Sequence, residues 1–582
     1  MHPRSQGIVV AVLAAIVLLP NLGGPPLWDD DEPRNAACSL AMHATGDWVV
    51  PTLHGRLRVE KPALVNWLHL AGFALAGVNE TGARLGSALL TLGTCLLVWR
   101  IGSLAFRPAV GCWAGLAMAT CLWTGVGGRA ATPDAPLVFC TTLALWLFVR
   151  GARVPRADGT SWRDGPVRLS AAAAASVGAA CGLAMLAKGP VGVAPPLVAF
   201  GGFAWWQACR DPGRSGPRAA RLLAGLPAAC RGIRPLVMLA AAAAVAAPWY
   251  AAVGWRTGGA WLHGFFVVHN VGRFAAPMEG HAGPTLLYYP LVVLVGMFPW
   301  SMASLLIGRH AAQSSRGAGD AAVATRLLVA WAAAWLVPLS LSATKLPGYA
   351  WPAYPAIAGL TGLFFADWVR LPAAATDRWM RLAWACLAAS GIALAVGLPL
   401  VARRFAPGAE WLGLIGIAPL AGAALAWSCQ SLRSRIAASA VLAGTACITV
   451  AALLAAGPAA LGRAGGTRQL IARIPTGHAA GTPPVAAYRA PPSTAFYGGR
   501  LMPGGSIVDL RTPVELTAFI AANPRAHVVV DARFEESLAA CWPEDYRVLH
   551  ATTALPESRR LLLVGPAARP DRLAADPAPP RR

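Results

Sequence analysis

Charged residues are scarce in this chain. They make up 13% of its 582 residues, whereas soluble globular proteins carry about 25%. Lysine is the scarcest charged type, because only three of the 49 lysine and arginine residues are lysine. Since 56% of the residues are hydrophobic, the composition argues against a soluble protein and for one that lies within a membrane.

Several common signatures are also missing. The 12 cysteines lie mostly in apolar stretches and show no metal-ligand spacing, so neither a disulfide framework nor a cysteine-based metal site is expected. No Gly-rich phosphate loop or nucleophile elbow is present, which argues against a nucleotide cofactor. The net charge is +23, but the arginines sit in short loops between apolar segments, which is a topology signal and not a nucleic-acid-binding face.

Apolar stretches of roughly 17–24 residues recur, and each is long enough to cross a hydrocarbon core about 30 Å thick. They predict an α-helical polytopic membrane protein with about 13 transmembrane helices. The first is read as an uncleaved span, because Pro20 and Asn21 follow it instead of a cleavage pattern. The spans are expected near residues 7–22, 83–105, 109–126, 134–150, 168–187, 190–208, 234–253, 285–308, 325–342, 349–368, 379–400, 411–429 and 435–456.

Arginine-rich loops alternate with loops that have few cations. The positive-inside rule places the basic loops in the cytoplasm, namely 150–168, 209–234, 309–326 and 369–381. The other loops, among them 23–82 and 254–284, then face outward, as does the C-terminus. This arrangement predicts a multi-pass membrane protein whose first large loop and C-terminal region lie on the outer face of the membrane.

The first outer loop and the C-terminal region have their own structure. Residues 1–460 are expected to form the transmembrane domain, and loop 23–82 to hold two short interfacial helices, one from Pro33 to about Thr45 and one after Pro62. Residues 461–582 are expected to form a small periplasmic α/β domain with a disordered tail. Its strands are predicted at 484–488, 526–534 and 559–565, and its helices at 513–523 and 535–541.

The three lysines all fall in loops assigned to the outer face. They are Lys61, Lys188 and Lys345. Lysine is a compact point charge, whereas arginine is a wide planar fork, so a tight phosphate site could require lysine. The alternative is that the three positions reflect chance or topology.

Prolines closely follow these lysines, and also follow Asp31 and Asp134. Because proline suits the first turn of a helix, the polar residues are expected at helix N-termini, where anions are favoured. The two aspartates form the best pair of carboxylates for general-base work or for orienting an acceptor. Ordinary helix capping is the alternative for both aspartates.

The outer loop 254–284 contains His263, His269, Glu279 and His281. A histidine and a glutamate from different loops could bind a divalent metal. The alternative is that these histidines only form hydrogen bonds at the membrane interface.

A set of motifs in order resembles the polyprenyl-phosphate-sugar-dependent glycosyltransferases of the C-type (GT-C) membrane fold. The likeness is strongest to the aminoarabinose transferases that modify lipid A, and protein O-mannosyltransferases are more distant. The matching motifs are DEPR at 31–34, GDWVVP at 46–51, EKP at 60–62, ARL at 83–85, TPDAPLVF at 132–139, KGP at 188–190, HNVGRF at 269–274, FPWS at 298–301 and TKLPGYAWPAYPA at 344–356.

The resemblance implies roles for single residues. Asp31 corresponds to the aspartate that acts as base or positions the acceptor, Asp134 to the second acid, and Lys61 to the catalytic lysine that meets the donor phosphate. Glu60 and His269 match positions where relatives hold a metal. Further contacts to the donor phosphate are expected from Arg58, Arg84, Lys188, Arg273 and Lys345.

The chain departs from the family pattern at a few positions. Asn35 stands where relatives have tyrosine, Arg58 and Val59 stand where aromatic residues are frequent, and Gly348 stands where some have histidine. These departures leave the sugar and the acceptor open.

The resemblance implies an inverting transfer of a sugar from a polyprenyl phosphate to a lipid A-like, glycan or protein acceptor. Membrane lipids are the other expected partners. A transporter or flippase of lipid-linked substrates is the main alternative, although it should carry charges near the midpoints of its spans. A structural membrane protein whose outer domain binds a partner is a second alternative.

Overall fold

The computed structural model describes residues 2–28, 31–156, 159–162, 166–210, 217–272, 286–370, 375–463, 466–474, 483–502, 507–554 and 559–567. The chain forms two compact units. The first comprises Met1–Pro25, Met42–Pro51 and Leu57–Leu461, and the second comprises Pro26–Ala41, Thr52–Arg56 and Gly462–Arg582.

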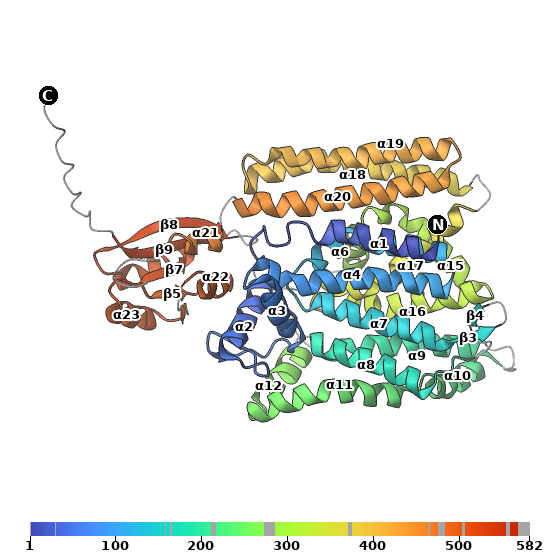
Figure 1. Ribbon diagram of the computed structural model, residues 1–582, viewed down its shortest axis with the longest axis horizontal. Helices are drawn as coiled ribbons and strands as arrows, with labels where there is room; N and C mark the ends of the chain where they lie inside the picture. Colours follow the sequence, from blue (N-terminus) through green and yellow to red (C-terminus); the bar gives the residue numbers. More distant parts are fainter. Residues whose placement is uncertain are drawn as a thin grey trace. The chain divides into compact units, whose positions relative to one another are not determined.

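The first unit is a bundle of helices, many of which lie alongside one another (Figure 1). Its helices are α1 (Pro3–Leu18), α3 (Leu64–Ala76), α4 (Glu80–Ala105), α5 (Pro108–Thr120), α6 (Leu122–Gly128), α7 (Asp134–Ala152), α8 (Ala171–Lys188), α9 (Ala194–Cys209), α10 (Arg218–Ile233), α11 (Pro235–Arg256), α12 (Ala260–Leu262), a π-helix at His263–Val271, α14 (Tyr288–Gly296), α15 (Ser304–Arg316), α16 (Asp320–Leu341), α17 (Tyr354–Trp368), α18 (Ala375–Phe405), α19 (Ile417–Ser431) and α20 (Arg435–Arg463).

This is a multi-pass membrane protein, but the count of 13 spans is not reached. The described residues contain 8 helices that are long and apolar enough to cross a membrane, or up to 10 if each bent pair is one span. The bent pairs are α5 with α6, at 59°, and α14 with Trp300–Arg316, at 120°. The three remaining predicted spans coincide with shorter helices. Helices α1 and α9 have 16 residues each, and α17 has 15.

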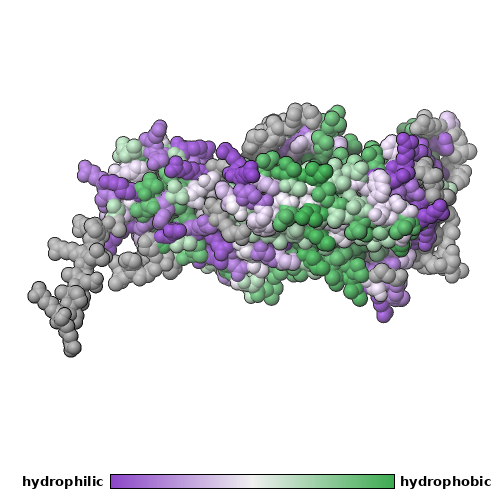
Figure 2. All heavy atoms as spheres, turned by 90° about the horizontal axis from the view of Figure 1, so that it is seen from above, coloured by the Kyte–Doolittle hydropathy of each residue, from purple (hydrophilic) through white to green (hydrophobic). Residues whose placement is uncertain are grey.

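The surface of the helices fits a lipid environment. On α18, Ile392, Val396 and Leu400 are more than half exposed and follow one another at a spacing of four residues, which places them on one face of the helix. Figure 2 shows a broad hydrophobic zone along the helices and hydrophilic side chains beyond it. The largest fully buried side chains are aromatic, among them Trp300 and Trp331.

Close packing of α8 against α11 positions the site. A Cβ on Gly178 would lie 2.1 Å from the carbonyl oxygen of Met238, and a Cβ on Gly182 would lie 2.6 Å from that of Ala242. Small residues allow this close backbone approach, as is common between membrane helices.

The second unit contains a five-stranded mixed sheet. The strand order is β6-β5-β7-β9-β8, in which β5 pairs in parallel with β6 and β7, and β9 pairs antiparallel with β7 and β8. The strands are β5 (Val485–Tyr488), β6 (Val508–Leu510), β7 (His527–Asp531), β8 (Tyr546–Ala554) and β9 (Arg559–Pro566), and the longer helices of the C-terminal segment are α22 (Ser493–Leu501) and α23 (Pro513–Ala522).

The predicted α/β character of the C-terminal region is confirmed. The strands expected at 484–488, 526–534 and 559–565 correspond to β5, β7 and β9, and the helix at 513–523 corresponds to α23. The segment at 535–541 is a 3-10 helix, Glu536–Cys541. The interfacial helices expected near Pro33 and after Pro62 are α2 (Asp31–Thr45) and α3.

Candidate active site

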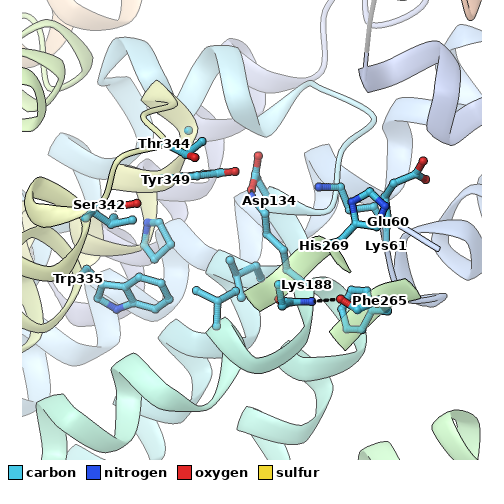
Figure 3. A pocket seen from close by; sticks show the side chains of 16 residues that line it. Glu60, Lys61, Asp134, Lys188, Phe265, His269, Trp335, Ser342, Thr344 and Tyr349 are labelled. Atoms are coloured by element: carbon cyan, nitrogen blue, oxygen red, sulfur yellow. Dashed lines mark hydrogen bonds and ion pairs between the residues drawn. The ribbon is translucent and has the colours of Figure 1, made fainter. Parts of the chain in front are cut away.

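A cavity of about 240 Å³ lies in the first unit, next to the start of α7. Figure 3 shows Glu60, Lys61 and His269 on one side of it and Trp335 and Tyr349 on the other. Its lining consists of Glu60, Lys61, Asp134, Leu137, Lys188, Val191, Phe265, His269, Asn270, Trp335, Leu339, Ser342, Thr344, Gly348, Tyr349 and Pro352. Three separate predicted motifs, EKP, TPDAP and KGP, therefore contribute charged side chains to one cavity.

An ion pair between Asp134 and Lys188 crosses this cavity wall. Asp134 is the first residue of α7 and Lys188 is the last residue of α8. A helix favours an anion at its N-terminus and a cation at its C-terminus, so both helix dipoles support the pair. Lys188 also lies over the ring of Tyr349, with its Nζ 4.7 Å from the ring centroid. The expectation of a helix N-terminus thus holds for Asp134 and also for Lys188, which ends α8 and is the N-cap of the 3-10 helix Gly189–Gly192.

Gly189 explains the KGP motif. Its φ is 77°, and a Cβ there would lie 2.5 Å from Cζ of Phe265. Only glycine adopts this backbone conformation without strain and leaves room for the ring. The turn therefore stops α8 directly after Lys188 and allows Phe265 to approach the cavity.

The EKP segment is held by buried polar contacts. The Nε of Arg58 donates to Oε2 of Glu60 at 3.0 Å, and the Arg58 side chain is only 3% exposed. The indole of Trp261 donates to the carbonyl oxygen of Arg58 at 2.8 Å. Arg58 therefore supports the segment that carries Lys61.

The π-helix His263–Val271 supplies His269 and Asn270 to the cavity. Asn270 Nδ2 donates to the carbonyl oxygen of Phe265 at 2.7 Å. The predicted metal ligands Glu60 and His269 thus line the same cavity. In the described part of the chain, no group of three or more His, Cys, Asp or Glu residues could hold a metal ion.

The opposite wall includes residues that the sequence analysis did not single out, among them Trp335, Leu339 and Ser342. Trp335 is 2% exposed, and its Nε1 has no hydrogen-bond partner among the described residues. A buried N–H without an acceptor is costly, so a ligand oxygen in the cavity would satisfy it. In the sequence, the only signal for these lining residues is an apolar helix that ends close to the TKLP motif.

Comparisons with known proteins show which proteins this chain is similar to. Residues 60–215 match the family described as dolichyl-phosphate-mannose-protein mannosyltransferase. The chain is 30% identical over 355 residues to the undecaprenyl phosphate-alpha-4-amino-4-deoxy-L-arabinose arabinosyl transferase of Aeromonas salmonicida, covering 60% of this chain and 58% of that enzyme. It is 28% identical to the enzyme of the same description from Pectobacterium carotovorum, covering 71% and 68%.

A solved structure extends the likeness to nearly the whole fold. ArnT from Cupriavidus metallidurans, in a crystal structure bound to undecaprenyl phosphate, matches with a TM-score of 0.75 and 22% identity, covering 96% of this chain and 98% of that one. In sequence and in fold, the chain is similar to the aminoarabinose transferases. The matched region spans less than two thirds of the Aeromonas enzyme's length.

Besides Arg58, two further cations expected at the donor phosphate have other contacts in this chain. Lys345 Nζ donates to the carbonyl oxygens of Leu339, Ser340 and Ser342 at 3.2, 2.9 and 2.8 Å, so it caps the end of α16. Arg84 donates to two carbonyl oxygens of the segment after α1 at 3.0 and 2.9 Å. Neither residue lines the cavity.

Two further predicted residues are not part of the described cavity. Arg273 lies outside the described residues. Asp31 is exposed at the start of α2, and it belongs to the second unit, whereas the cavity belongs to the first. The role of Asp31 therefore stays a prediction from the resemblance.

The GDWVVP motif has a structural role in the first unit. Oδ1 of Asp47 accepts from the backbone N–H groups of Val49 and Val50 at 2.9 and 3.2 Å and from Arg256 at 2.7 Å. Burial alone would raise the pKa of the Asp47 carboxyl, but these N–H donors and the Arg256 guanidinium lower the pKa below its usual value. Asp47 thus ties the turn to the end of α11.

Proposed function

We propose that this protein transfers a sugar from an undecaprenyl-phosphate-linked donor, or a similar polyprenyl-phosphate donor, to an acceptor at the outer face of the bacterial inner membrane. The printed activity of the curated relatives supports this donor. The bound undecaprenyl phosphate in ArnT, whose fold this chain shares, supports it as well. A lipid A-like acceptor follows the resemblance to the aminoarabinose transferases, and a glycan or protein acceptor is the alternative.

The observation that carries the proposal is the meeting of Lys61, Asp134 and Lys188 in one cavity. Two of the three lysines of the chain line it. A cavity with two ammonium groups suits an anion, and a lipid phosphate is the anion that such a membrane site would meet. The ammonium of Lys188 has three N–H groups, so it can keep its bond to Asp134 and still donate to a phosphate oxygen.

The proposed reaction is a single displacement at the anomeric carbon. An oxygen of the acceptor attacks this carbon, a new C–O bond forms, and the bond from the carbon to the phosphate oxygen breaks. The polyprenyl phosphate leaves with the electron pair. Lys61 and Lys188 stabilise its growing negative charge, which is the form of electrostatic catalysis that usually contributes most.

The proton of the acceptor hydroxyl passes to a carboxylate. The resemblance assigns this step to Asp31, and Asp134 then orients Lys188 and the sugar. If the acceptor is itself a phosphate, it is already deprotonated, and Asp31 only positions it. The indole N–H of Trp335 and the hydroxyl groups of Ser342 and Thr344 suit the hydroxyl groups of a sugar.

Glu60 and His269 fit the binding of a divalent metal only in part. They supply two ligands from one cavity wall, and Glu60 already accepts from Arg58. A tetrahedral metal needs four ligands, so phosphate oxygens or water would complete the shell. When bound there, a cation would supply positive charge to the departing phosphate.

The experiment follows release of polyprenyl phosphate by the purified full chain in nanodiscs, supplied with polyprenyl-phosphate sugars and candidate acceptors. We expect Lys61→Gln and Asp134→Asn to lower turnover by about a hundredfold or more, as losses of charged groups from active sites do. The control is Arg403→Gln, an exposed residue of α18. Wild-type turnover in both site variants would rule out this site.

The alternative function, a flippase, is tested with the same purified chain. Nanodiscs serve to measure release of polyprenyl phosphate, and liposomes serve to measure transport. A flippase would move a fluorescent polyprenyl-phosphate sugar across a liposome membrane without cleaving the sugar–phosphate bond. Transport without release of polyprenyl phosphate would overturn the transferase proposal.

A further inference from the structure

A second cavity, of about 1060 Å³, lies between α4 and α7. Its lining runs from Phe139 to Arg153 along and just beyond α7, whereas the candidate active site lies at Asp134. At a rise of 1.5 Å per residue, Arg150 lies about 24 Å along the helix from Asp134. The lining consists of Gly93, Leu96, Leu97, Trp99, Arg100, Ser103, Leu104, Phe139, Trp146, Arg150 and Arg153.

Three arginines make this cavity strongly cationic. Arg100 and Arg150 are exposed at the ends of their helices, and among the described residues neither forms an ion pair with an acid. Arg153 lies 3.6 Å from Asp320, which offsets its charge in part. Within the described part of the chain, the cavity therefore has two positive charges that no acidic side chain balances.

Tryptophan rings orient two of these arginines. The guanidinium carbon of Arg100 lies 4.6 Å from the ring centroid of Trp99, and that of Arg150 lies 5.5 Å from the ring of Trp146. A guanidinium that rests on an aromatic face keeps its N–H groups at the edge free to donate. Oxyanions such as phosphate match this planar fork of donors.

A buried donor adds to the cationic lining. Trp99 is 7% exposed and lines the cavity, and its Nε1 has no acceptor within the described residues. Since a buried N–H without a partner is unfavourable, an oxygen of a bound ligand would remove this cost. Ser103 also lines the cavity, but its Oγ lies against α5, where a Cβ on Gly111 would be 2.0 Å away.

The rest of the cavity is apolar. Leu96, Leu97 and Phe139 line it toward the middle of the two helices. Gly93 lets the ring of Phe139 lie close, because a Cβ there would be 2.8 Å from its Cε2. A ligand that fits both parts has an anionic phosphate head and a hydrocarbon chain.

We propose that this cavity binds the phosphodiester headgroup of an anionic phospholipid, from the leaflet at the arginine-rich end of the helices. Arg100 and Arg150 bind the phosphate oxygens, and an acyl chain lies along Leu96, Leu97 and Phe139. Free inorganic phosphate would not use the apolar part. A zwitterionic lipid would leave one of the two unbalanced charges unmatched. Basic pockets between membrane helices are a known way of holding anionic lipids.

The test measures lipid binding to the purified, delipidated full chain by native mass spectrometry and by the rise in melting temperature. The probes are phosphatidylglycerol, phosphatidylethanolamine and inorganic phosphate. We expect the double variant Arg100→Gln with Arg150→Gln to bind phosphatidylglycerol about tenfold more weakly, because each arginine contributes to anionic lipid binding.

A matched control removes the same charge elsewhere on the same face of the membrane. Arg378→Gln with Arg381→Gln changes two exposed arginines of α18 that do not line the cavity, and it should bind phosphatidylglycerol as the wild type does. Equal binding of phosphatidylethanolamine, equal stabilisation by inorganic phosphate, or equal losses in both double variants would overturn the proposal. The proposed transferase activity does not enter this readout, so the two proposals fail independently.

Discussion

At the scale of single residues, the three lysines of the chain have three different environments. Lys61 lines the candidate active site, Lys188 is paired with Asp134 there, and Lys345 donates to three carbonyl oxygens. The sequence could select all three because lysine is so scarce. The sequence could not show that Lys345 caps a helix whereas Lys61 and Lys188 line the cavity. A cluster of carbonyl oxygens and a phosphate site both need a compact ammonium group.

The pair of Asp134 and Lys188 predicts a non-additive effect on stability. The two side chains are 24% and 14% exposed, so Asp134→Asn or Lys188→Gln alone leaves one poorly solvated charge without its partner. We expect the double variant to lose about 1–3 kcal/mol less stability than the sum of the losses in the two single variants. Thermal unfolding of the four proteins in one detergent measures this. Additive effects would show that the two charges do not interact.

Trp335 predicts a loss of activity without a loss of stability. Trp335→Phe keeps an aromatic ring on α16 but removes the N–H group, which has no partner among the described residues. If this N–H binds the sugar, the KM for the donor should rise and kcat/KM should fall by about tenfold, the effect of one lost hydrogen bond. The melting temperature should change little.

Trp331, on the same helix, provides the contrast. Its Nε1 donates to the carbonyl oxygen of Pro352 at 2.9 Å. Trp331→Phe should therefore lower the stability by about 1–3 kcal/mol, because a buried acceptor loses its donor. If Trp335→Phe gives this result and keeps the wild-type kcat/KM, its N–H has no role toward the sugar.

At the scale of elements, the sequence predicted the positions of the helices better than it predicted which helices cross the membrane. Each predicted span coincides with helix, because hydropathy reports apolar runs reliably. An apolar run does not reveal a bend. The bend of 120° between α14 and Trp300–Arg316, which are joined through Pro299, therefore fell within one predicted span. Strands β6 and β8 were missed, since Val508–Leu510 is short and Tyr546–Ala554 includes polar residues on both faces.

The turn at Gly189 is a sharp test of how an element positions a side chain. Gly189→Ala would force a side chain into a φ of 77° and to within 2.5 Å of Phe265. We expect a loss of about 1–3 kcal/mol in stability and a loss of turnover, because Lys188 is displaced.

Gly202→Ala is the matched control for this substitution. Gly202 lies within α9, and a Cβ there would meet nothing within 4 Å. Alanine in a helix interior is more favourable than glycine by about 1 kcal/mol. This variant should be as stable as the wild type or more so. Equal behaviour of the two variants would mean that the Gly189 turn is not constrained.

The Asp47 turn predicts a pH dependence. Because the folded pKa of Asp47 is lowered, its contribution to stability is present above the unfolded pKa of about 3.9 and is lost as the pH falls through the folded pKa. Asp47→Asn should therefore lower stability by about 1 kcal/mol at neutral pH. The difference in melting temperature from the wild type should stay constant down to about pH 5 and narrow below about pH 4. A difference that grows as the pH falls would contradict this assignment.

At the scale of the whole molecule, the division of the chain does not follow the sequence order. Residues Pro26–Ala41, in the first predicted outer loop, belong to the same unit as the C-terminal sheet. Within that unit, the buried backbone N–H of Leu27 donates to the Tyr497 hydroxyl at 2.8 Å. Composition changes near residue 460, but no local pattern could show that an N-terminal segment folds with the C-terminal domain. Such a contact joins a backbone N–H and a side-chain hydroxyl 470 residues apart.

Charge asymmetry predicts the orientation of the whole protein. Arginines cluster after α7 and between α9 and α11, whereas the candidate active site lies at the opposite end of α7. The positive-inside rule therefore places Arg168 in the cytoplasm and the loop after α11 outside. Fusions of alkaline phosphatase, which is active only outside the cytoplasm, should be inactive after Arg168 and active after Gly258. Green fluorescent protein at the same points should give the opposite pattern, and a reversed result would move the candidate active site to the cytoplasmic side.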